Sequence, residues 1–248
     1  MNEEFYDIIA RYYDTMQDGI DHDAWASMID GFIREYCKCE GSGEGGKKLI
    51  TDLGCGSGTI IIKLEHDYGY DCIGIDHSVL MLDEARNLAG EDSKILWLNQ
   101  DITDFELYGR SDIFICTTET VNHITEEEDL RNIFKAFELY LNEGGLFIFD
   151  VGTRQHFEET LGDNVFYEDY DEVTLLWDNT YDPETGLSTS DMTIFYSDDG
   201  ENYKRSDATV FERYYPEEYL KSLAKEYKME YLTRREEGER VFLVFRRG

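Results

Sequence analysis

Apolar residues recur with helical spacing at the start of the chain and then gather in short unbroken runs. Over residues 5–16 and 25–36 the spacing predicts two amphipathic helices. The stretch CEGSGEGG that follows is too rich in glycine to hold a helix, so it predicts a loop. Beyond it, apolar runs alternate with helical patterns, the runs being KKLITDL, DCIGID, KILWLNQD, DIFICTT and GLFIFDV. Such an alternation indicates a parallel sheet with helices on both faces.

The segments between these runs contain the predicted crossover helices. Residues 130–141 place their apolar side chains along one side of a helix. The stretch GTIIIKLEHDYG is a weaker helix former, because its consecutive β-branched isoleucines lose side-chain freedom in a helix. We nevertheless expect a helix there, since neighbouring parallel strands need a right-handed crossover.

The pattern changes again after Asp150. The runs NVFYEDY, EVTLLWDNTYD, LSTSDMTIFYS and YKRSDATVFERYY, with turn signals between the later ones, predict antiparallel hairpins. Next, PEEYLKSLAKEY predicts a helix, and a hairpin ends the chain. We therefore expect residues 1–150 to contain the opening helices and the main sheet, residues 151–215 a β insertion, and residues 216–248 the elements that complete the core.

The charge balance bears on the partners. The 248 residues include 55 acidic and 23 basic side chains, which gives a formal net charge of -32. Such a surface repels nucleic acid and anionic lipid, so we expect neither as a partner. No apolar stretch is long enough to cross a bilayer, and the acidic start MNEEFYDIIARYYD is unlike a signal peptide. These features predict a cytoplasmic protein. We also expect a monomer or a homodimer.

Cysteine and histidine spacing predicts no metal site. The cysteines are odd in number and scattered, and we expect reduced thiols at Cys37, Cys39, Cys55, Cys72 and Cys116. The pair in CKC lacks the two-residue spacer and the second ligand pair of a zinc site. The positions of His22, His66 and His156 match no metal-ligand spacing. We expect these side chains to lie in solvent or in local structure.

The stretch DLGCGSGT follows the first predicted strand and precedes a helix. Glycines at alternate positions let main-chain amides approach a ligand that a Cβ would hold off, beside a helix N-terminus. A tight turn without a ligand is the alternative. The spacing of Gly54, Gly56 and Gly58 differs from the GxGxxG of dinucleotide sites, which counts against NAD.

A second acid, Asp76, ends the next predicted strand. Its carboxylate can accept hydrogen bonds from both hydroxyls of a ribose. The alternative is a helix N-cap, which Ser78 can also provide, and both roles fit this segment. The glycine stretch and Asp76 together therefore indicate a nucleoside-like ligand.

The chain from RYYDTM to LFIFDV resembles the class I S-adenosylmethionine-dependent methyltransferases. The resemblance implies an α/β fold with a Rossmann-like, seven-stranded, mostly parallel sheet, helices on both faces, and S-adenosylmethionine as cofactor. It places the glycine loop against the methionine part and the ribose, and Asp76 on the ribose hydroxyls. It also places Asp101 and the amide of Ile102 at the adenine. The cofactor-binding residues that it implies are Tyr13, Asp52, Gly54, Cys55, Gly56, Gly58, Asp76, His77, Met81, Asp101, Ile102 and Thr117.

The opening RYYDTMQDGIDHDAWASMI is similar to a small-molecule subgroup of that family. In this subgroup the N-terminal helices form a lid, and the tyrosine matched by Tyr13 approaches the cofactor's carboxylate. Antiparallel strands after the fifth core strand form an auxiliary layer over the substrate site. The segment LYLNEGGLFIFD matches the turn into the fifth strand, although Glu143 replaces a common proline. That departure affects the stiffness of the turn and not the chemistry.

The segment TTETVNHI follows the fourth strand, where the family lines the route to the methyl group. His123 is the candidate general base, because imidazole titrates near neutrality; a surface histidine at a helix start is the alternative. Glu119 and Asn122 are candidates to orient a substrate hydroxyl or amine, or else to make loop hydrogen bonds. Positioning is the main requirement, since methyl transfer needs nucleophile, methyl carbon and sulfur in line.

The expected function is methyl transfer from S-adenosylmethionine to the nitrogen or oxygen of a small molecule. Aromatic residues in the inserted strands could wall a pocket for an aromatic or sugar-like acceptor, or serve ordinary strand packing. A protein or RNA acceptor is less compatible with the acidic composition. Two rival functions are a regulator that binds S-adenosylmethionine or S-adenosylhomocysteine without turnover, and a nicotinamide oxidoreductase.

Overall fold

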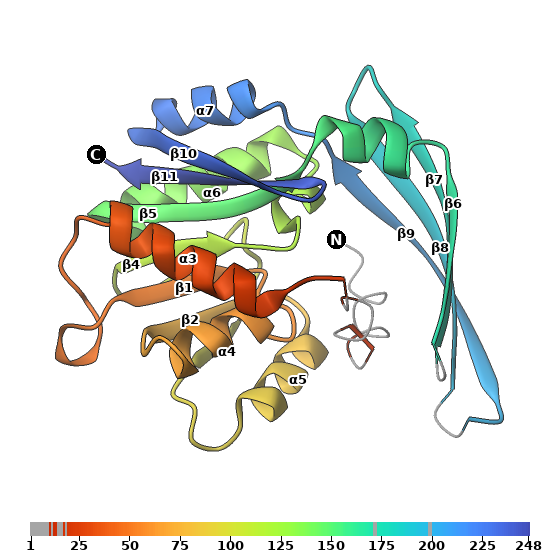
Figure 1. Cartoon of the computed structure of the whole chain (residues 1–248), viewed down its shortest axis with the longest axis horizontal. Coiled ribbons are helices and arrows are strands. Elements are labelled where there is room, and N and C mark those ends of the chain that lie inside the picture. Colours follow the sequence, from red (N-terminus) through yellow and green to blue (C-terminus); the bar gives the residue numbers. More distant parts are fainter. Residues whose placement is uncertain (1–9, 11, 14–16, 18, 171–172, 198–199) are drawn as a thin grey trace.

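The structure is a computed structural model that describes the chain except residues 1–9, 11, 14–16, 18, 171–172 and 198–199 (Figure 1). The first predicted helix, over residues 5–16, lies mostly outside the described residues. The second is confirmed as α3 (His22–Tyr36). Its first turn is capped by Asp21, whose carboxylate accepts a hydrogen bond of 2.9 Å from the amide of Ala24. Within the described residues, no helix is long and apolar enough to cross a membrane.

A seven-stranded sheet forms the core, in the order β10-β11-β5-β4-β1-β2-β3. The pairs among β1 to β5 are parallel, and β11 and β10 are antiparallel, as predicted. Its strands are β1 (Leu49–Leu53), β2 (Asp71–Asp76), β3 (Leu96–Asn99), β4 (Ser111–Cys116), β5 (Leu141–Gly152), β10 (Met229–Glu237) and β11 (Arg240–Arg247). Every residue of the central strand β4 is buried, which explains its unbroken apolar run.

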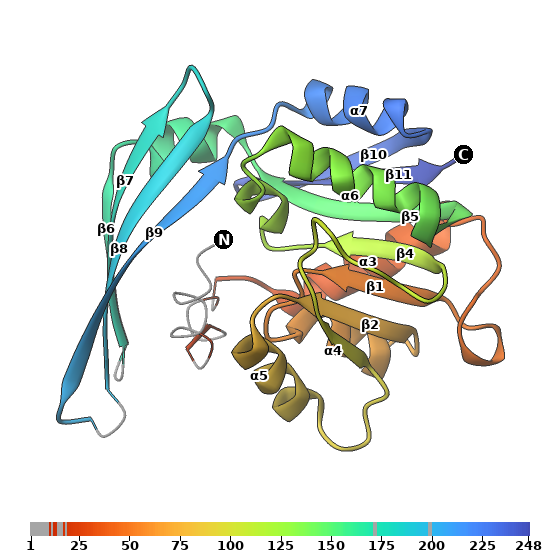
Figure 2. The same ribbon diagram turned by 180° about the vertical axis from the view of Figure 1, so that it is seen from behind.

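Helices cover both faces of this sheet. Side chains of α3 and α4 (Thr59–His66) pack on one face, and those of α6 (Glu127–Tyr140) and α7 (Glu217–Glu226) on the other. Figure 1 shows α3 in front of the sheet, and Figure 2 shows α6 from behind. The helix α5 (Val79–Ala89) contacts β2 and β3. The predicted helix with consecutive isoleucines is therefore confirmed as α4, because its isoleucines are used in packing.

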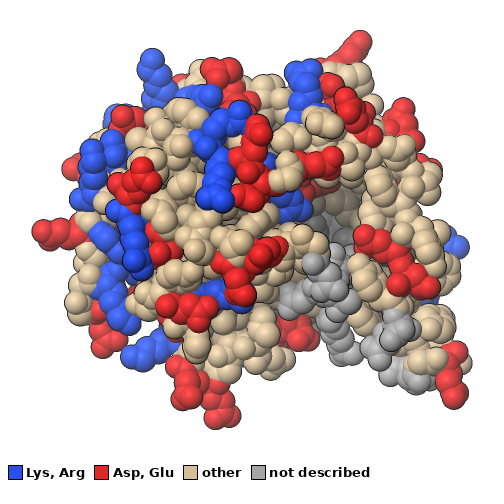
Figure 3. Space-filling view, in the orientation of Figure 1, with Lys and Arg blue, Asp and Glu red and all other residues tan. Residues whose placement is uncertain are grey.

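The predicted antiparallel strands form a separate sheet, here called the outer sheet, in the order β6-β7-β8-β9. Its strands are β6 (Val165–Asp169), β7 (Val173–Asp182), β8 (Leu187–Ser197) and β9 (Tyr203–Arg213). A short π-helix, η3 (His156–Leu161), links β5 to this sheet. Figure 1 shows the outer sheet beside the carboxyl edge of the core sheet. Figure 3 shows a hollow between the two.

The expected turn before the fifth strand differs in the structure. The helix α6 ends at Tyr140 and β5 begins at Leu141, so no separate loop joins them. The irregularity lies inside β5, where Gly144 has a φ of 76° and the pairing with β4 shifts register between Ser111 and Ile113. Gly144 permits this bend because it has no Cβ to strain at positive φ.

Asn122 connects the core to both ends of the segment that carries the outer sheet. Its side-chain oxygen accepts a hydrogen bond of 3.0 Å from the amide of Gly152, where β5 ends. Its side-chain nitrogen donates one of 2.8 Å to the carbonyl of Arg213, where β9 ends. Asn122 is fully buried in a short 3-10 helix, η2 (Thr120–His123). We call this arrangement the Asn122 clamp.

Candidate active site

The glycine loop turns the chain sharply from β1 into α4. Gly54, Gly56 and Gly58 have φ values of 70°, 53° and 78°, a region that side chains disfavour. A Cβ at Gly54 would lie 2.5 Å from the side chain of Thr120, and one at Gly58 would lie 2.6 Å from Trp97. The missing side chains therefore bring the loop against its protein neighbours, and the amides of Gly54 and Cys55 donate hydrogen bonds to the carbonyl of Ile75 on the next strand.

Asp76 holds this loop from the end of the neighbouring strand β2. One carboxylate oxygen accepts a 2.9 Å hydrogen bond from the amide of Gly56, and the other accepts one of 2.9 Å from the amide of Ser78. Burial raises the pKa of Asp76. Ser78 is the N-cap of α5, since its hydroxyl accepts from the amide of Met81. The capping role thus falls to Ser78, while lone pairs of the Asp76 carboxylate remain for a ligand hydroxyl.

Asp52 lies beneath the loop at the end of β1 and is 2 % exposed. Burial, reinforced by the negative charge of Asp76, raises the pKa of Asp52 to about 8. Its Oδ1 has no hydrogen-bond partner in the described part of the chain. Two carboxyl groups therefore share one buried region, and keeping both of them charged is costly unless one takes up a proton.

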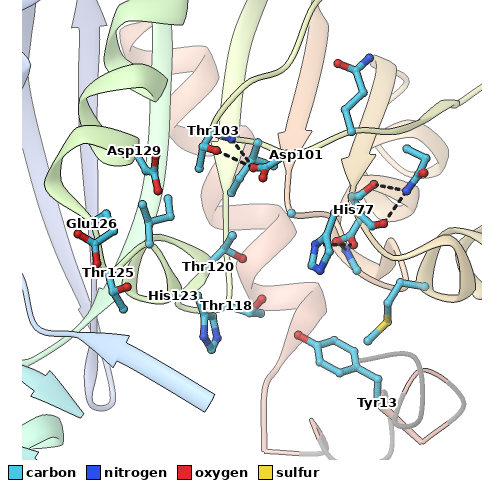
Figure 4. A pocket seen from close by; sticks show the side chains of 18 residues that line it. Tyr13, His77, Asp101, Thr103, Thr118, Thr120, His123, Thr125, Glu126 and Asp129 are labelled. Atoms are coloured by element: carbon cyan, nitrogen blue, oxygen red, sulfur yellow. Dashed lines mark hydrogen bonds and ion pairs between the residues drawn. The ribbon is translucent and has the colours of Figure 1, made fainter. Parts of the chain in front are cut away.

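A cavity of about 570 Å³, here called the first cavity, opens above the loop. Figure 4 shows side chains from both halves of the parallel sheet converging on it. Nine of the predicted site residues line it, namely Tyr13, Gly54, Gly56, Asp76, His77, Met81, Asp101, Ile102 and His123. Other residues that line it include Thr118, Thr120, Thr125, Glu126 and Asp129. The family resemblance implies that Thr117 binds the cofactor. In the structure the next residue, Thr118, lines the cavity instead.

Six other predicted residues lie outside the lining of the first cavity. These are Asp52, Cys55, Gly58, Thr117, Glu119 and Asn122. The Thr117 carbonyl accepts hydrogen bonds from the hydroxyls of Thr118 and Thr120, at 2.6 and 2.7 Å. The Cys55 sulfur lies near Gly74, where a Cβ would approach it to 3.0 Å. Thr117 and Cys55 thus contact other parts of the site and not the cavity itself.

The end of the first cavity near β3 has the features of a base-binding pocket. Met81 and Ile102 are buried there, at 1 % and 4 % exposure, and both line the cavity. Asp101 is exposed, and one of its oxygens accepts 2.8 Å hydrogen bonds from the amide and the hydroxyl of Thr103. This pair of bonds fixes the carboxylate beside two apolar side chains.

Thr118 and Glu119 follow β4 with positive φ values of 59° and 60°. Two consecutive non-glycine residues in this region are strained, and such strain concentrates at functional sites. The amide of Glu119 donates a 3.0 Å hydrogen bond to the buried carboxylate of Asp150. The Glu119 side chain lies 2.9 Å from Arg240 and 3.5 Å from His156. The strained turn therefore places a nearly buried carboxylate next to two basic groups.

Four residues of the site escape the sequence prediction, namely Arg240, His156, Asp150 and Glu212. Arg240 begins β11 and lies 5.5 Å from the ring centroid of Trp25. The sequence places His156 in solvent or local structure, but its ring also lies 2.9 Å from Glu239 and its side chain is 17 % exposed. These residues come from elements far apart in the sequence, so only the folded sheet edge brings them together. Arg240 follows a turn with no motif around it, so the sequence does not mark it as a site residue.

His123 lies where the core meets the outer sheet. Its Nε2 is 3.6 Å from a carboxylate oxygen of Glu212 on β9. Burial lowers the pKa of His123 to about 4, which keeps the ring neutral at pH 7. Burial and the charge of Glu119 raise the pKa of Glu212 to about 7. This pair therefore combines a neutral imidazole with a carboxyl group that titrates near neutrality.

A second cavity, of about 720 Å³, lies between His123 and the outer sheet. Its lining comes mainly from β8 and β9, and includes Asp191, Met192, Thr193, Asp207, Ala208, Thr209, Val210 and Phe211. His123 and Thr125 line both cavities. Among the described residues, no lysine or arginine lines either cavity. The two cavities therefore meet at His123, and their charged lining is acidic.

The glycine loop and the buried acid at the next strand end belong to the Rossmann-like nucleoside-binding proteins. Residues 50–145 match a family model described as a methyltransferase domain. A methyltransferase of Geobacillus sp. (strain WCH70) is 28% identical over 204 residues, which are 82% of this chain and 79% of the relative.

A crystal structure of an S-adenosylmethionine-dependent methyltransferase from Clostridium acetobutylicum ATCC 824 aligns with a TM-score of 0.82 and 28% identity, over 98% of this chain and 99% of that one. A glycine/sarcosine N-methyltransferase of Halorhodospira halochloris is 32% identical over 157 residues, covering 60% of this chain and 53% of the relative. The chain is a class I S-adenosylmethionine-dependent methyltransferase.

Proposed function

We propose that this methyltransferase methylates an amine nitrogen of a small molecule, which binds in the second cavity. The observation that carries the proposal is the position of His123, whose side chain lines both cavities. A nucleophile in the second cavity can reach a group held in the first only at this junction. S-adenosylmethionine, when bound, supplies an electrophilic methyl group on a sulfonium.

The residues of the first cavity fit this cofactor. Gly54 and Gly56 line the cavity without side chains, and Asp76 presents a fixed carboxylate for hydroxyl groups. Met81 and Ile102 provide apolar surface for a purine, with Asp101 at its edge. Tyr13 also lines the cavity, beside Gly56, where a Cβ would lie 3.5 Å from the tyrosine ring. We propose these residues as the cofactor-binding set.

The electrostatics support an amine acceptor. Asp191 and Asp207 line the second cavity, where Asp191 contributes negative charge and Asp207 pairs with the exposed Arg205 at 2.7 Å. Such a lining attracts a cationic amine and repels a phosphate or carboxylate group. The relative from Halorhodospira halochloris is named as an N-methyltransferase, which agrees with nitrogen as the acceptor atom. The same lining disfavours RNA.

A protonated amine must lose a proton before it attacks, because only the neutral nitrogen has a free lone pair. His123 lies at the junction and is neutral at pH 7, so we assign it to relay this proton to Glu212, whose raised pKa of about 7 makes it the stronger base of the pair. Glu212, 3.6 Å from the imidazole, stabilises the charged ring during this relay. Glu119 and Asn122 are assigned as positioning residues, since their side chains contact Arg240 and main-chain groups.

The test is S-adenosylhomocysteine formation with matched pairs of small molecules, each pair differing only by an amine or a hydroxyl. We expect saturable turnover with an amine and much slower turnover with its hydroxyl counterpart. Turnover with the hydroxyl members alone would contradict the nitrogen assignment. Tight cofactor binding in calorimetry, with no turnover across a broad panel of amines, would favour the non-catalytic regulator instead.

A further inference from the structure

The two thiols of the CKC stretch lie side by side at the edge of the core sheet opposite the active site. Their sulfur atoms, in Cys37 and Cys39, are 3.2 Å apart, and both residues are partly exposed. Cys37 is the C-cap of α3, and Cys39 lies near Asp112 at the start of β4. The active site lies at the other ends of the parallel strands, so this pair is separate from the methyl-transfer chemistry.

Asp112 and Lys48 fix the place of Cys39. The Cys39 sulfur lies 3.4 Å from Oδ1 of Asp112 and 3.8 Å from Nζ of Lys48. The ammonium group of Lys48 also donates a hydrogen bond to the Cys39 carbonyl. The other oxygen of Asp112 accepts hydrogen bonds from the amides of Ser42 and Leu49, at 2.8 and 2.9 Å. The pair therefore has fixed charged neighbours at this edge of the sheet.

These neighbours treat the two thiols differently. The hydrogen bond between the two sulfurs, together with the positive charge of Lys48, lowers the pKa of Cys37. The same hydrogen bond, burial and the negative charge of Asp112 raise the pKa of Cys39. Cys37 is therefore the thiol of the pair that more readily forms the thiolate, which is the reactive form of a cysteine.

The remaining cysteines form an internal comparison. Cys72 and Cys116 are buried, at 6 % and 1 % exposure. Burial raises the pKa of both thiols, and also that of Cys55. A dissolved oxidant should therefore meet the more acidic thiol at Cys37, a protonated thiol at the partly exposed Cys55, and protonated, shielded thiols at Cys72 and Cys116.

We propose that Cys37 and Cys39 form an oxidisable dithiol site, in which Cys37 reacts with hydrogen peroxide and Cys39 then closes an intramolecular disulfide. The Cys37 thiolate attacks one peroxide oxygen, the O–O bond breaks, and the departing oxygen leaves as water after protonation. The Cys39 sulfur attacks the resulting sulfenic acid and releases a second water. Two thiols lose two electrons and two protons, and one peroxide is reduced to two waters. The sulfurs need to approach by about 1.2 Å, from 3.2 Å to a bond of about 2.0 Å.

Metal binding is the weaker explanation for this pair. A stable soft-metal site usually needs further sulfur or imidazole ligands, and the described residues contain no group of three metal-ligating side chains. The proximity of Lys48 also disfavours a cation at the sulfurs.

The test exposes the full-length protein to a small molar excess of hydrogen peroxide, blocks the remaining thiols with N-ethylmaleimide, and analyses tryptic peptides by mass spectrometry. Trypsin cuts after Arg34, Lys38 and Lys47, so the disulfide would join residues 35–38 to residues 39–47. We expect this joined species to accumulate before any oxidation of Cys72 or Cys116, and to vanish after dithiothreitol. Equal oxidation of all cysteines, or no joined species, would overturn the proposal.

Two variants separate the roles of the sulfurs. In Cys39→Ser the sulfenic acid on Cys37 has no thiol to resolve it, so dimedone should trap it. In Cys37→Ser neither the disulfide nor the trapped adduct should form. Cys72→Ala is the matched control and should oxidise as the unmodified protein does. Dimedone labelling at Cys39 in Cys37→Ser would reverse the assignment, and unchanged S-adenosylhomocysteine affinity in all three variants verifies that each is folded.

Discussion

The core sheet and the outer sheet meet the solvent in opposite ways. Strand β4 is buried at every position, whereas β6 alternates between exposed and partly buried residues. The difference follows from their cover, since helices pack on both faces of the core sheet and the outer sheet has one face toward the core. A core strand therefore packs against other elements on both of its faces. An outer strand packs on one face only.

The two sheets also contribute to different parts of the candidate site. The core contributes the glycine loop and Asp76, whose contacts to main-chain amides leave little room for change. The outer sheet contributes most of the second cavity, where Asp191, Thr193 and Asp207 belong to β8 and β9. We expect cofactor binding to depend on the first set and acceptor choice on the second. His123 and Glu212 belong to the junction.

The largest effect is expected at that junction. His123→Ala should lower turnover roughly 10²- to 10⁴-fold, because the proton of the acceptor loses its relay group. The dissociation constant of this variant for S-adenosylhomocysteine, measured by calorimetry, should stay within about twofold of that of the unmodified protein, since the residues that hold Asp76 and the loop are untouched. His66→Ala, at an exposed position on α4, is the matched control. Normal turnover in His123→Ala would remove the imidazole from proton transfer.

A variant of the core should affect both halves of the reaction through the cofactor. Asp76→Ala removes two hydrogen bonds that fix the loop and the proposed ribose contact, so the affinity for S-adenosylhomocysteine should fall about tenfold or more. Asp76→Asn keeps one acceptor oxygen and should lie between Asp76→Ala and the unmodified protein. Asp83→Ala, on the exposed side of α5, provides the control. An unaltered dissociation constant would exclude Asp76 as a ribose ligand.

The Asn122 clamp should determine how firmly the two sheets are joined. Asn122→Ala leaves the Gly152 amide and the Arg213 carbonyl without their partner, which should reduce the free energy of unfolding by about 1 to 3 kcal/mol. Hydrogen exchange should rise at the ends of β5 and β9 and stay unchanged in β1. Urea unfolding measures the first effect, with the exposed Asn87→Ala as reference. Uniformly raised exchange would argue against a local clamp.

The last prediction concerns pH and the buried carboxyl group of Asp52. Its pKa is about 8 in the folded protein and about 4 when unfolded, so the folded state binds the proton more tightly. The contribution of Asp52 to stability is therefore most favourable below about pH 4 and is lost as the pH rises toward 8. Asp52→Asn should make the melting temperature fall less between pH 5 and pH 8 than in the unmodified protein. Parallel melting curves against pH would contradict this.

The order and type of the core elements could be predicted from the sequence because their apolar runs reflect packing on two faces. The four strands of the outer sheet are predictable as well, since turn signals such as DPETG separate its later strands. The exception in the core is the entry to β5, where Leu141 continues directly from α6. Strand pairing with β4 extends the strand over residues that read as a turn.

The candidate site was predictable only where one short segment carries it. The glycine loop and His123 follow strand ends and have local patterns, so they could be found in the sequence. Arg240 and Glu212 could not, because each lies in an ordinary strand and approaches the site only when β11 and β9 reach the sheet edge. Burial gives these charged side chains their role in the site. That burial depends on neighbours in the fold and not on spacing along the sequence.

The Asn122 clamp has a consequence for how such enzymes diversify. The side-chain amide of Asn122 binds both Gly152, where the chain leaves the core, and Arg213, where it comes back. The distance between these two residues is therefore fixed by the core. Recombination can then graft another sheet of the same closing distance onto this position without disturbing the nucleoside-binding half. A lineage could change the molecules it modifies by exchanging one contiguous block of sequence.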